Sequence, residues 1–207
     1  MTLFLQEAKV NLDAIAEQLK YNKVGKVIQE YVEELKSDFE GTILDIETIG
    51  DFDRSYQYDS RHYRNLKQVI FGYINKDNLH IYCARSFEGI EKLKLMTPQI
   101  FDGLQRPYYA FNCNFESGVW YHHTGVQINF DGELQGEPYE SKKNAILRLK
   151  ISNYNDPFYD KGQMCIKAWN DHDFEKAIAH NRACLLKERD ILLKRGHCEP
   201  DKVRFVE

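Results

Sequence analysis

The chain has 207 residues, of which 43% are hydrophobic and 29% charged, and these values are ordinary for a globular protein with one packed core. The net charge of −4 disfavours a protein that coats nucleic acid with a basic surface, but it allows an enzyme that meets nucleic acid at a bound cation. No apolar run is long enough for a transmembrane helix, the first residues make a poor signal peptide, and the five cysteines are scattered without a CxxC pair. We therefore expect a cytoplasmic protein with reduced thiols, no membrane contact, and neither a disulfide framework nor a structural zinc site.

Residues 1–40 are predicted to form an N-terminal helical extension. Two segments, 7–20 and 26–39, carry apolar residues at helical spacing, and Gly25 lies near the break between them. Neither segment shows a pattern that indicates catalysis. We expect amphipathic packing helices whose outer face is a candidate contact for a protein partner.

Residues 41–207 are predicted to form a domain in which strands are followed by alternating helices and strands. Strands are expected at 42–47, 68–74, 79–84, 106–113 and 126–131, and the Asn and Asp of segment 75–78 are typical of a hairpin turn. Helices are expected at 87–104, with an interruption near Pro98, and at 115–125, 140–149 and 173–196, with Gly125 and Gly196 as stops. This order predicts an α/β fold with a mixed five-stranded sheet flanked by helices.

The first predicted strand ends with two carboxylates, Asp45 and Glu47, on either side of Ile46. Side chains at i and i+2 of a strand lie on the same face, so the two acids are expected to point the same way and to repel each other. Burying such a pair is unfavourable unless something compensates the charge. A bound divalent cation is one remedy.

The fourth predicted strand leads through Asn112 into a helix whose first turn contains Glu116. The helix dipole favours a carboxylate in the first turn, which explains Glu116 without any function. If this strand lies beside the first one, Glu116 is also delivered toward Asp45 and Glu47, because ligands in such sheets bind beyond the carboxyl ends of strands.

The last predicted helix contains His180, Cys184 and Glu188 at intervals of four residues, so these side chains share one face. A single histidine on a helix is more often a packing residue than a functional one. The loop at 51–67 interleaves Arg54 and Arg61 with tyrosines, which suits phosphate contact and base stacking, although a solvated loop is the simpler interpretation.

Together these segments resemble the DEDD superfamily of 3′–5′ exonucleases, which have a ribonuclease H-like fold. The segment "LDIETIG" (44–50) is similar to the first motif, D-x-E-T-x-G, and "AFNCNFE" (110–116) is similar to the second motif. The segment "HNRAC" (180–184) lies where the third motif is expected, and residues 160–182 resemble the preceding segment of the YprB-like branch. The resemblance covers residues 41 to about 195, and the order of predicted elements is also that of ribonuclease H-like domains.

The resemblance implies a nuclease that hydrolyses phosphodiester bonds at single-stranded 3′ ends of nucleic acid by a two-metal mechanism. Asp45, Glu47 and Glu116 would bind Mg²⁺ or Mn²⁺. Two such cations stabilise the charge on the entering and leaving oxygens, and one makes hydroxide available near neutral pH. Mg²⁺ prefers hard oxygen ligands and retains water, so a few carboxylates and the phosphate suffice.

The resemblance also implies roles for residues around these acids. Thr48 would contact the terminal nucleotide, and Asn112 would support the acid of the second motif or the substrate. His180 would orient or activate the attacking water. Arg54 and Arg61 would contact the substrate at the border of the site.

Two positions depart from the family pattern. The acid of the second motif is Glu116 rather than Asp, which is still a hard oxygen ligand. The Asp of the third motif is replaced by Cys184, whose thiol is a soft ligand poorly matched to Mg²⁺. Glu188 lies one turn further on, displaced by about 6 Å along the helix. The alternative function is therefore a catalytically degenerate ribonuclease H-like module that binds nucleic acid or acts as a scaffold.

Overall fold

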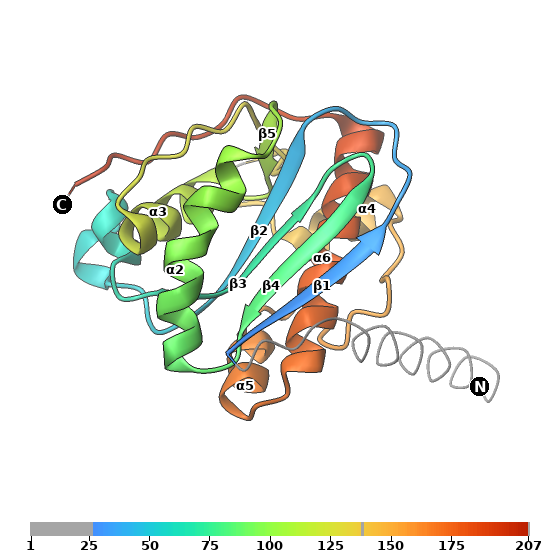
Figure 1. The fold of residues 1–207 in the computed structure, drawn as a ribbon. Coiled ribbons are helices and arrows are strands. Elements are labelled where there is room, and N and C mark those ends of the chain that lie inside the picture. The colour runs from blue at the N-terminus through green and yellow to red at the C-terminus, as the bar shows by residue number, and fades with distance from the viewer. Residues whose placement is uncertain (1–26, 138, 207) are drawn as a thin grey trace.

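The computed structural model describes residues 27–137 and 139–206, which form an α/β fold around one mixed sheet (Figure 1). The strands are β1 (Ile28–Glu34), β2 (Thr42–Ile49), β3 (Lys67–Ile74), β4 (Asn78–Ala84), β5 (Tyr108–Ala110) and β6 (Gly132–Glu133). They lie in the order β1-β4-β3-β2-β5-β6. The pairs β1–β4, β4–β3 and β3–β2 are antiparallel, whereas β5 is parallel to both β2 and β6. The expected mixed sheet is therefore present, with six strands instead of five.

Helices cover both faces of this sheet, as expected. The described helices are α2 (Phe87–Asp102), α3 (Cys113–Thr124), α4 (Lys142–Leu149), α5 (Gln163–Asn170) and α6 (Phe174–Arg195), with two short 3₁₀ helices, η1 (Arg54–Tyr56) and η2 (Ser60–Tyr63). Helices α2 and α3 pack on one face, and α6 packs on the opposite face, against β2, β3 and β4, with α4 and α5 beside it (Figure 1). Within residues 27–137 and 139–206, no helix combines the length and the apolar character needed to cross a membrane.

The three central strands form the predicted meander. In the turn between β3 and β4, the Asn75 side chain accepts hydrogen bonds from the backbone N–H groups of Asp77 and Asn78, each at 2.9 Å. In β2, which is covered on both faces, every residue except Glu47 is buried. This double burial explains why β2 is a nearly continuous apolar run.

The helix predicted at 26–39 is wrong, because residues 28–34 form strand β1 of the sheet. Strand β1 pairs with β4 at seven positions, from Ile28 opposite Ala84 to Glu34 opposite Asn78. Tyr31 is fully buried in this arrangement. Pairing with a free sheet edge therefore overrides the helical spacing of the apolar residues. The other predicted helix, at 7–20, lies outside the described residues.

The strand predicted at 126–131 is also wrong, because these residues form no strand: the backbone N–H of Asp131 donates a hydrogen bond to the carbonyl of Tyr108 at 2.8 Å, and the short strand β6 follows it. The Asp131 carboxylate accepts a hydrogen bond from the backbone N–H of Tyr108 at 2.7 Å, in place of the backbone carbonyl that a paired strand would offer. The predicted interruption at Pro98 does not occur, and α2 continues through it. Proline frees the carbonyl of Lys94, and Lys94 lies on the exposed side of α2, where water can reach it.

Helix α5 was not predicted. Its buried residues, Cys165, Ala168 and Trp169, have the i, i+3, i+4 spacing of a short amphipathic helix. The indole N–H of Trp169 donates a hydrogen bond to the carbonyl of Ala84 at 2.6 Å, which ties α5 to the end of β4. This contact places α5 beside the carboxyl end of β2, where the candidate site lies.

Candidate metal centre

A pocket of about 340 Å³ lies beside the carboxyl-terminal half of β2. Its lining includes all the candidate metal-binding and catalytic residues of the three sequence motifs, together with Cys184: Asp45, Glu47, Thr48, Asn112, Glu116, His180 and Cys184. Lys142 from α4 and the aromatic rings of Phe52, Phe111 and Phe115 complete much of the remaining wall. The fold thus brings residues from β2, α3 and α6 to one point.

Asp45 and Glu47 both point from β2 toward α6, as their spacing predicts. One oxygen of Asp45 accepts a hydrogen bond from the Asn181 side chain at 2.7 Å, and the other lies 2.9 Å from the Lys142 ammonium. Glu47 Oε1 lies 3.5 Å from His180 Nε2. Burial, with a smaller contribution from the charge of Asp45, raises the pKa of Glu47 to about 7 against the opposing effects of His180 and Lys142. The two acids therefore do repel each other in this pocket.

Glu116 reaches the pocket from the first turn of α3. Asn112 fixes the start of this helix, because its side chain accepts a hydrogen bond from the backbone N–H of Phe115 at 3.0 Å, as an N-cap residue does. Strand β5 pairs with β2 only at the first two residues of β2, so the edge of β2 is free beyond them. At this free edge the backbone N–H of Ile46 donates a hydrogen bond to Glu116 Oε2 at 3.1 Å. Glu116 thus lies beside the Asp45/Glu47 pair and faces the same pocket.

A lysine that the sequence analysis did not identify bridges two carboxylates of the site. Lys142 is the first residue of α4, and its ammonium lies 2.9 Å from Asp45 Oδ1 and 2.5 Å from Glu188 Oε1. The Glu188 side chain is fully buried, and its Oε2 has no hydrogen-bond partner among the described residues. Lys142 therefore places a positive charge where the family resemblance implies a metal ion.

The pocket contains more acids than cations. Burial raises the pKa of both Glu116 and Glu188 well above the ordinary 4.5, and the negative charge of Asp45 adds to this effect. Although burial opposes it, the surrounding negative groups raise the pKa of Lys142 well above 10.5, so its ammonium stays charged. Carboxyl groups that hold protons so strongly are groups that a bound cation would ionise.

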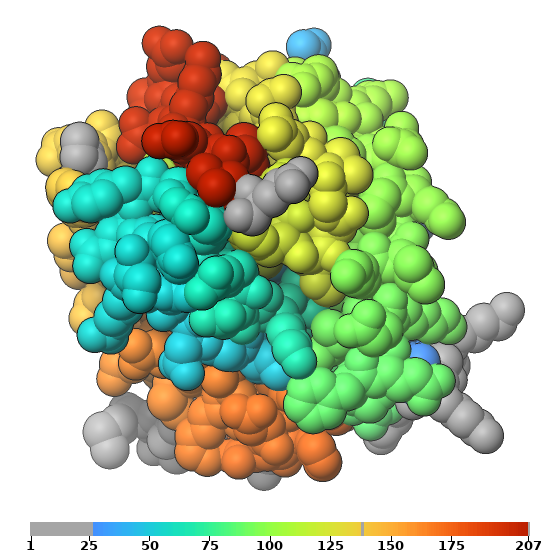
Figure 2. Space-filling model, turned by 90° about the vertical axis from the view of Figure 1, so that its left-hand side faces the viewer, coloured from blue at the N-terminus to red at the C-terminus, as the bar shows by residue number. Residues whose placement is uncertain are grey.

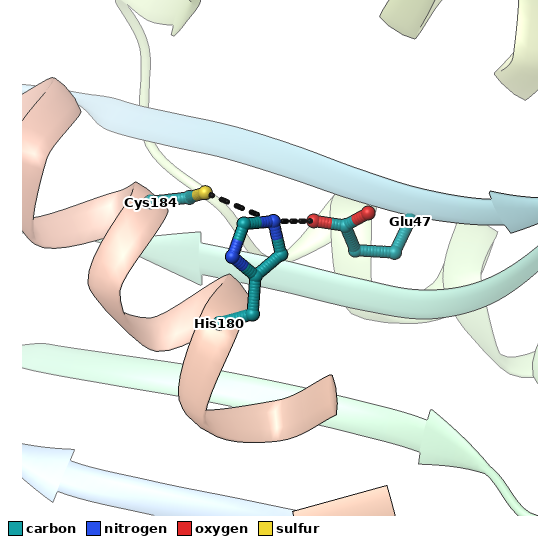
Figure 3. Close-up of side chains that lie close together, drawn as sticks. All are labelled: Glu47, His180 and Cys184. Atoms are coloured by element: carbon teal, nitrogen blue, oxygen red, sulfur yellow. Dashed lines mark hydrogen bonds and ion pairs between the residues drawn. The ribbon is translucent and has the colours of Figure 1, made fainter. Parts of the chain in front are cut away.

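Glu47, His180 and Cys184 form a compact group within the pocket (Figure 3). His180 and Cys184 lie one turn apart on α6, and His180 Nε2 is 3.5 Å from Glu47 Oε1 and 3.7 Å from Cys184 Sγ. In the part of the chain that the structure describes, these three are the His, Cys, Asp or Glu residues whose ligand atoms all lie within 4.8 Å of one another. They could bind a metal ion, whereas the oxygens of Asp45 and Glu116 do not join this group.

Asp156 holds the other side of the His180 ring. Its Oδ1 lies 2.7 Å from His180 Nδ1, and its Oδ2 accepts a hydrogen bond from the Lys187 ammonium at 2.7 Å. Against the effect of burial, these partners hold the pKa of Asp156 well below its ordinary value. Although burial lowers the pKa of His180, its neighbours Cys184 and Glu47 and its bond to Asp156 raise it to about 12. A protonated ring can donate a hydrogen bond to a water molecule but cannot take a proton from it.

The two arginines expected to contact the substrate do not line this pocket. Arg54 and Arg61 border a separate hollow formed by residues 54–61. Arg61 is paired with Asp59 at 2.7 Å, and its guanidinium lies 4.1 Å from the centre of the Tyr56 ring. Figure 2 shows this segment in cyan on the surface beside the C-terminal segment in red, to which it is hydrogen-bonded. Phe52, at the start of the same loop, does line the pocket.

Sequence reasoning missed several of the residues that complete the site. Lys142 stands next to a second lysine at the start of α4, and no feature of the sequence distinguishes the two. Asp156 lies in a loop without any recognised motif. Asn181 is adjacent to His180 on α6. The helical spacing could have predicted that the Asn181 side chain also points toward the sheet.

Comparisons with family models, with curated proteins and with solved structures gave no match. The function is therefore inferred from the chemistry of the pocket. Its acids, its imidazole and its thiol can hold a divalent cation, and its ammonium and aromatic rings can contact a charged, ring-containing ligand.

Proposed function

We propose that this chain is a metal-dependent nuclease of the ribonuclease H-like fold that removes nucleotides from single-stranded 3′ ends. The strand order supports this fold, because an antiparallel meander of β2, β3 and β4 is followed by two parallel strands, β5 and β6. The observation that carries the proposal is that Asp45 and Glu47 from β2 and Glu116 from α3 line one pocket with His180. Carboxylates gathered at one point support the proposal, because phosphodiester hydrolysis by bound Mg²⁺ or Mn²⁺ uses such oxygen ligands.

The residues of the pocket fit a divalent cation unequally. Glu47 is the acid best placed to hold one, because no ammonium or amide is bonded to its carboxylate in the described structure. Both oxygens of Asp45 are already engaged, so Lys142 has to move for Asp45 to become a ligand. A bound cation would supply Lewis-acid stabilisation of the phosphate and a water that ionises near neutral pH.

Other residues are suited to hold the substrate. The Lys142 ammonium can contact a phosphate oxygen as a point charge. Phe52, Phe111 and Phe115 can stack on the terminal base or sugar, which binds single strands without strong sequence preference. The protonated ring of His180 can orient a water molecule by donating a hydrogen bond.

A nuclease assay tests the proposal. Purified protein is incubated with 3′-labelled single-stranded DNA and RNA oligonucleotides in Mg²⁺ or Mn²⁺, and immediate release of labelled mononucleotide is expected. Asp45→Asn and Glu47→Gln should each lower the rate by at least about 100-fold, as loss of one strong electrostatic contact does. Glu133→Gln is the matched control, because Glu133 is also a buried acid but lies outside the pocket. Equal activity in wild type and Asp45→Asn would reject the proposal.

A binding or scaffolding module is the second candidate, and one observation favours it. Lys142 already pairs with both Asp45 and Glu188, so a cation other than a metal ion occupies part of the pocket. This candidate predicts that the oligonucleotide binds, measured by fluorescence anisotropy, and that no mononucleotide is released with either metal.

A further inference from the structure

We infer that Glu47, His180 and Cys184 form a binding site for one zinc-class transition-metal ion, with Asp156 as the residue that positions the histidine ligand. The three side chains offer an oxygen, a nitrogen and a sulfur donor from β2 and α6. Zn²⁺ and Co²⁺ accept this mixed set, whereas Mg²⁺ does not accept a thiolate. The inference does not depend on the proposed nuclease activity.

The spacing of the donor atoms fits a tetrahedral ion. With typical zinc–ligand bond lengths, a tetrahedral site separates a nitrogen from an oxygen ligand by about 3.4 Å and a nitrogen from a sulfur ligand by about 3.6 Å. The corresponding distances from His180 Nε2 are 3.5 Å to Glu47 Oε1 and 3.7 Å to Cys184 Sγ. Two of the three donor–donor separations therefore match a tetrahedral ion, and the third, between the Glu47 carboxylate and Cys184 Sγ, is no longer than 4.8 Å (Figure 3).

Hydrogen bonding explains only one of these two contacts, the 3.7 Å contact between His180 Nε2 and Cys184 Sγ. An N–H···O bond normally has a donor–acceptor distance of 2.7–3.2 Å, so the contact of 3.5 Å between His180 and Glu47 is too long for one. His180 Nε2 carries at most one hydrogen, which cannot point at both Glu47 and Cys184. A shared ion satisfies all three groups at once.

Asp156 is an independent observation that points to metal binding. Metal-ligating histidines almost always direct their other ring nitrogen to a carboxylate, a carbonyl or water, which fixes the ring and its tautomer. His180 Nδ1 lies 2.7 Å from Asp156 Oδ1, so Nε2 is the nitrogen that faces the pocket. Lys187 holds the other oxygen of Asp156, and the side chains of both residues are fully buried. The imidazole is therefore fixed with Nε2 directed toward Glu47 and Cys184, and a metal ion that binds there displaces the proton from this nitrogen.

The site also leaves room for a fourth ligand. All three donors line the pocket of about 340 Å³, and the Glu47 side chain is 14% exposed, so an ion and a water molecule can enter. Three protein ligands with one open position is the arrangement of catalytic rather than structural zinc sites.

Cobalt spectroscopy tests the site directly. All proteins carry Cys198→Ser, because Cys198 is the exposed member of the five cysteines and would bind metal nonspecifically. Metal-free protein is titrated with Co²⁺, and one equivalent should produce a thiolate-to-cobalt charge-transfer band in the near ultraviolet. One equivalent of Zn²⁺ should remove the band, whereas a thousandfold excess of Mg²⁺ should not.

Two variants of Cys184 and one control variant test whether Cys184 is the sulfur ligand. Cys184→Ser should abolish the band and weaken Zn²⁺ binding by at least about 100-fold, the upper end of the loss seen when a supporting residue is removed. Cys184→Asp should also abolish the band and shift preference toward Mn²⁺, because a carboxylate is a harder ligand. Cys113→Ser is the control, since Cys113 is equally buried but contacts only backbone carbonyls outside the pocket. Circular dichroism checks folding, and Cys184→Ala replaces Cys184→Ser if the latter does not fold.

The outcomes distinguish failure of the zinc-class site from failure of the proposed nuclease function. Absence of the band in the Cys198→Ser protein, or a band that survives Cys184→Ser, would overturn the zinc-class site. Zinc binding without nuclease activity would leave this inference standing and reject the proposed function. Mg²⁺-dependent nuclease activity in a protein that gives no cobalt–thiolate band would support the proposed function and reject the zinc-class site.

Discussion

The bridge formed by Lys142 gives a measurable test of how charge is balanced in the pocket. Lys142→Met keeps the length of the side chain but removes the ammonium that lies between Asp45 and Glu188. The two carboxylates then face each other without a cation in a buried site. The simplest response is that one of them, Glu188, takes up a proton, because burial already raises its pKa well above 4.5.

The free energy needed to protonate Glu188 sets the expected decrease in the free energy of unfolding. An ordinary carboxyl group has a pKa of 4.5, so protonating it at pH 7 costs about 3.4 kcal/mol at about 1.36 kcal/mol per pH unit. The folded variant then holds a proton that the unfolded chain has released, so its stability falls as pH rises. The loss relative to wild type should be at most about 2 kcal/mol at pH 6 and about 5 kcal/mol at pH 8, because the raised pKa of Glu188 means that wild type already bears part of this cost.

Urea unfolding followed by tryptophan fluorescence measures this loss, because Trp120 and Trp169 are both buried. Wild type and Lys142→Met are compared at pH 6, 7 and 8 in the presence of a chelator. Lys167→Met is the matched control, because the Lys167–Asp171 pair is exposed and should contribute less than about 1 kcal/mol. If Lys142→Met is as stable as wild type at all three pH values, the ammonium does not neutralise these acids and the reasoning fails.

Three further predictions concern other parts of the fold. Burial lowers the pKa of His123 to about 4, so this residue should remove about 2–3 kcal/mol of stability between pH 6.5 and pH 4.5, and His123→Leu should lose less than wild type over the same urea series. Asn112→Ala should lower the free energy of unfolding by about 1 kcal/mol, because the N-cap of α3 is lost. Asn112→Ser keeps a capping side chain, so both the stability and the nuclease rate should be retained. A large drop in the rate of Asn112→Ser would instead indicate that Asn112 contacts the substrate. A Cβ on Gly72 would lie 2.1 Å from Asn181 Oδ1, so Gly72→Ala should cost about 1–3 kcal/mol in urea unfolding.

The parts of the site that could be predicted are those set by local geometry. The two-residue period of a strand directs Asp45 and Glu47 to one face, and the structure places both toward α6. The four-residue spacing on α6 likewise places His180, Cys184 and Glu188 together on a buried face. These relations hold within one element, so they do not depend on how the elements pack.

The parts that could not be predicted depend on contacts between distant segments. The apolar spacing of residues 26–39 is compatible with a helix, and only the free edge of β4 selects a strand there. Lys142 enters the site because α4 packs on α6, and this contact joins residues far apart in the chain. Asp156 acquires its role in the same way, by approaching His180 from a loop without regular structure.

The distribution of charge indicates which part of the pocket still requires a cation. Asp45 and Glu188 share the Lys142 ammonium, so a metal ion is not needed to stabilise that pair. Glu47 has no ammonium partner, and burial together with the charge of Asp45 raises its pKa to about 7 although the His180 ring lies 3.5 Å away. One dication at Glu47 and one ammonium at Asp45 would together provide three positive charges beside a bound phosphate, one fewer than two divalent metal ions provide. On this basis the replacement of an acid by Cys184 does not by itself mean loss of function, because Lys142 supplies half of the charge that a second divalent ion would bring.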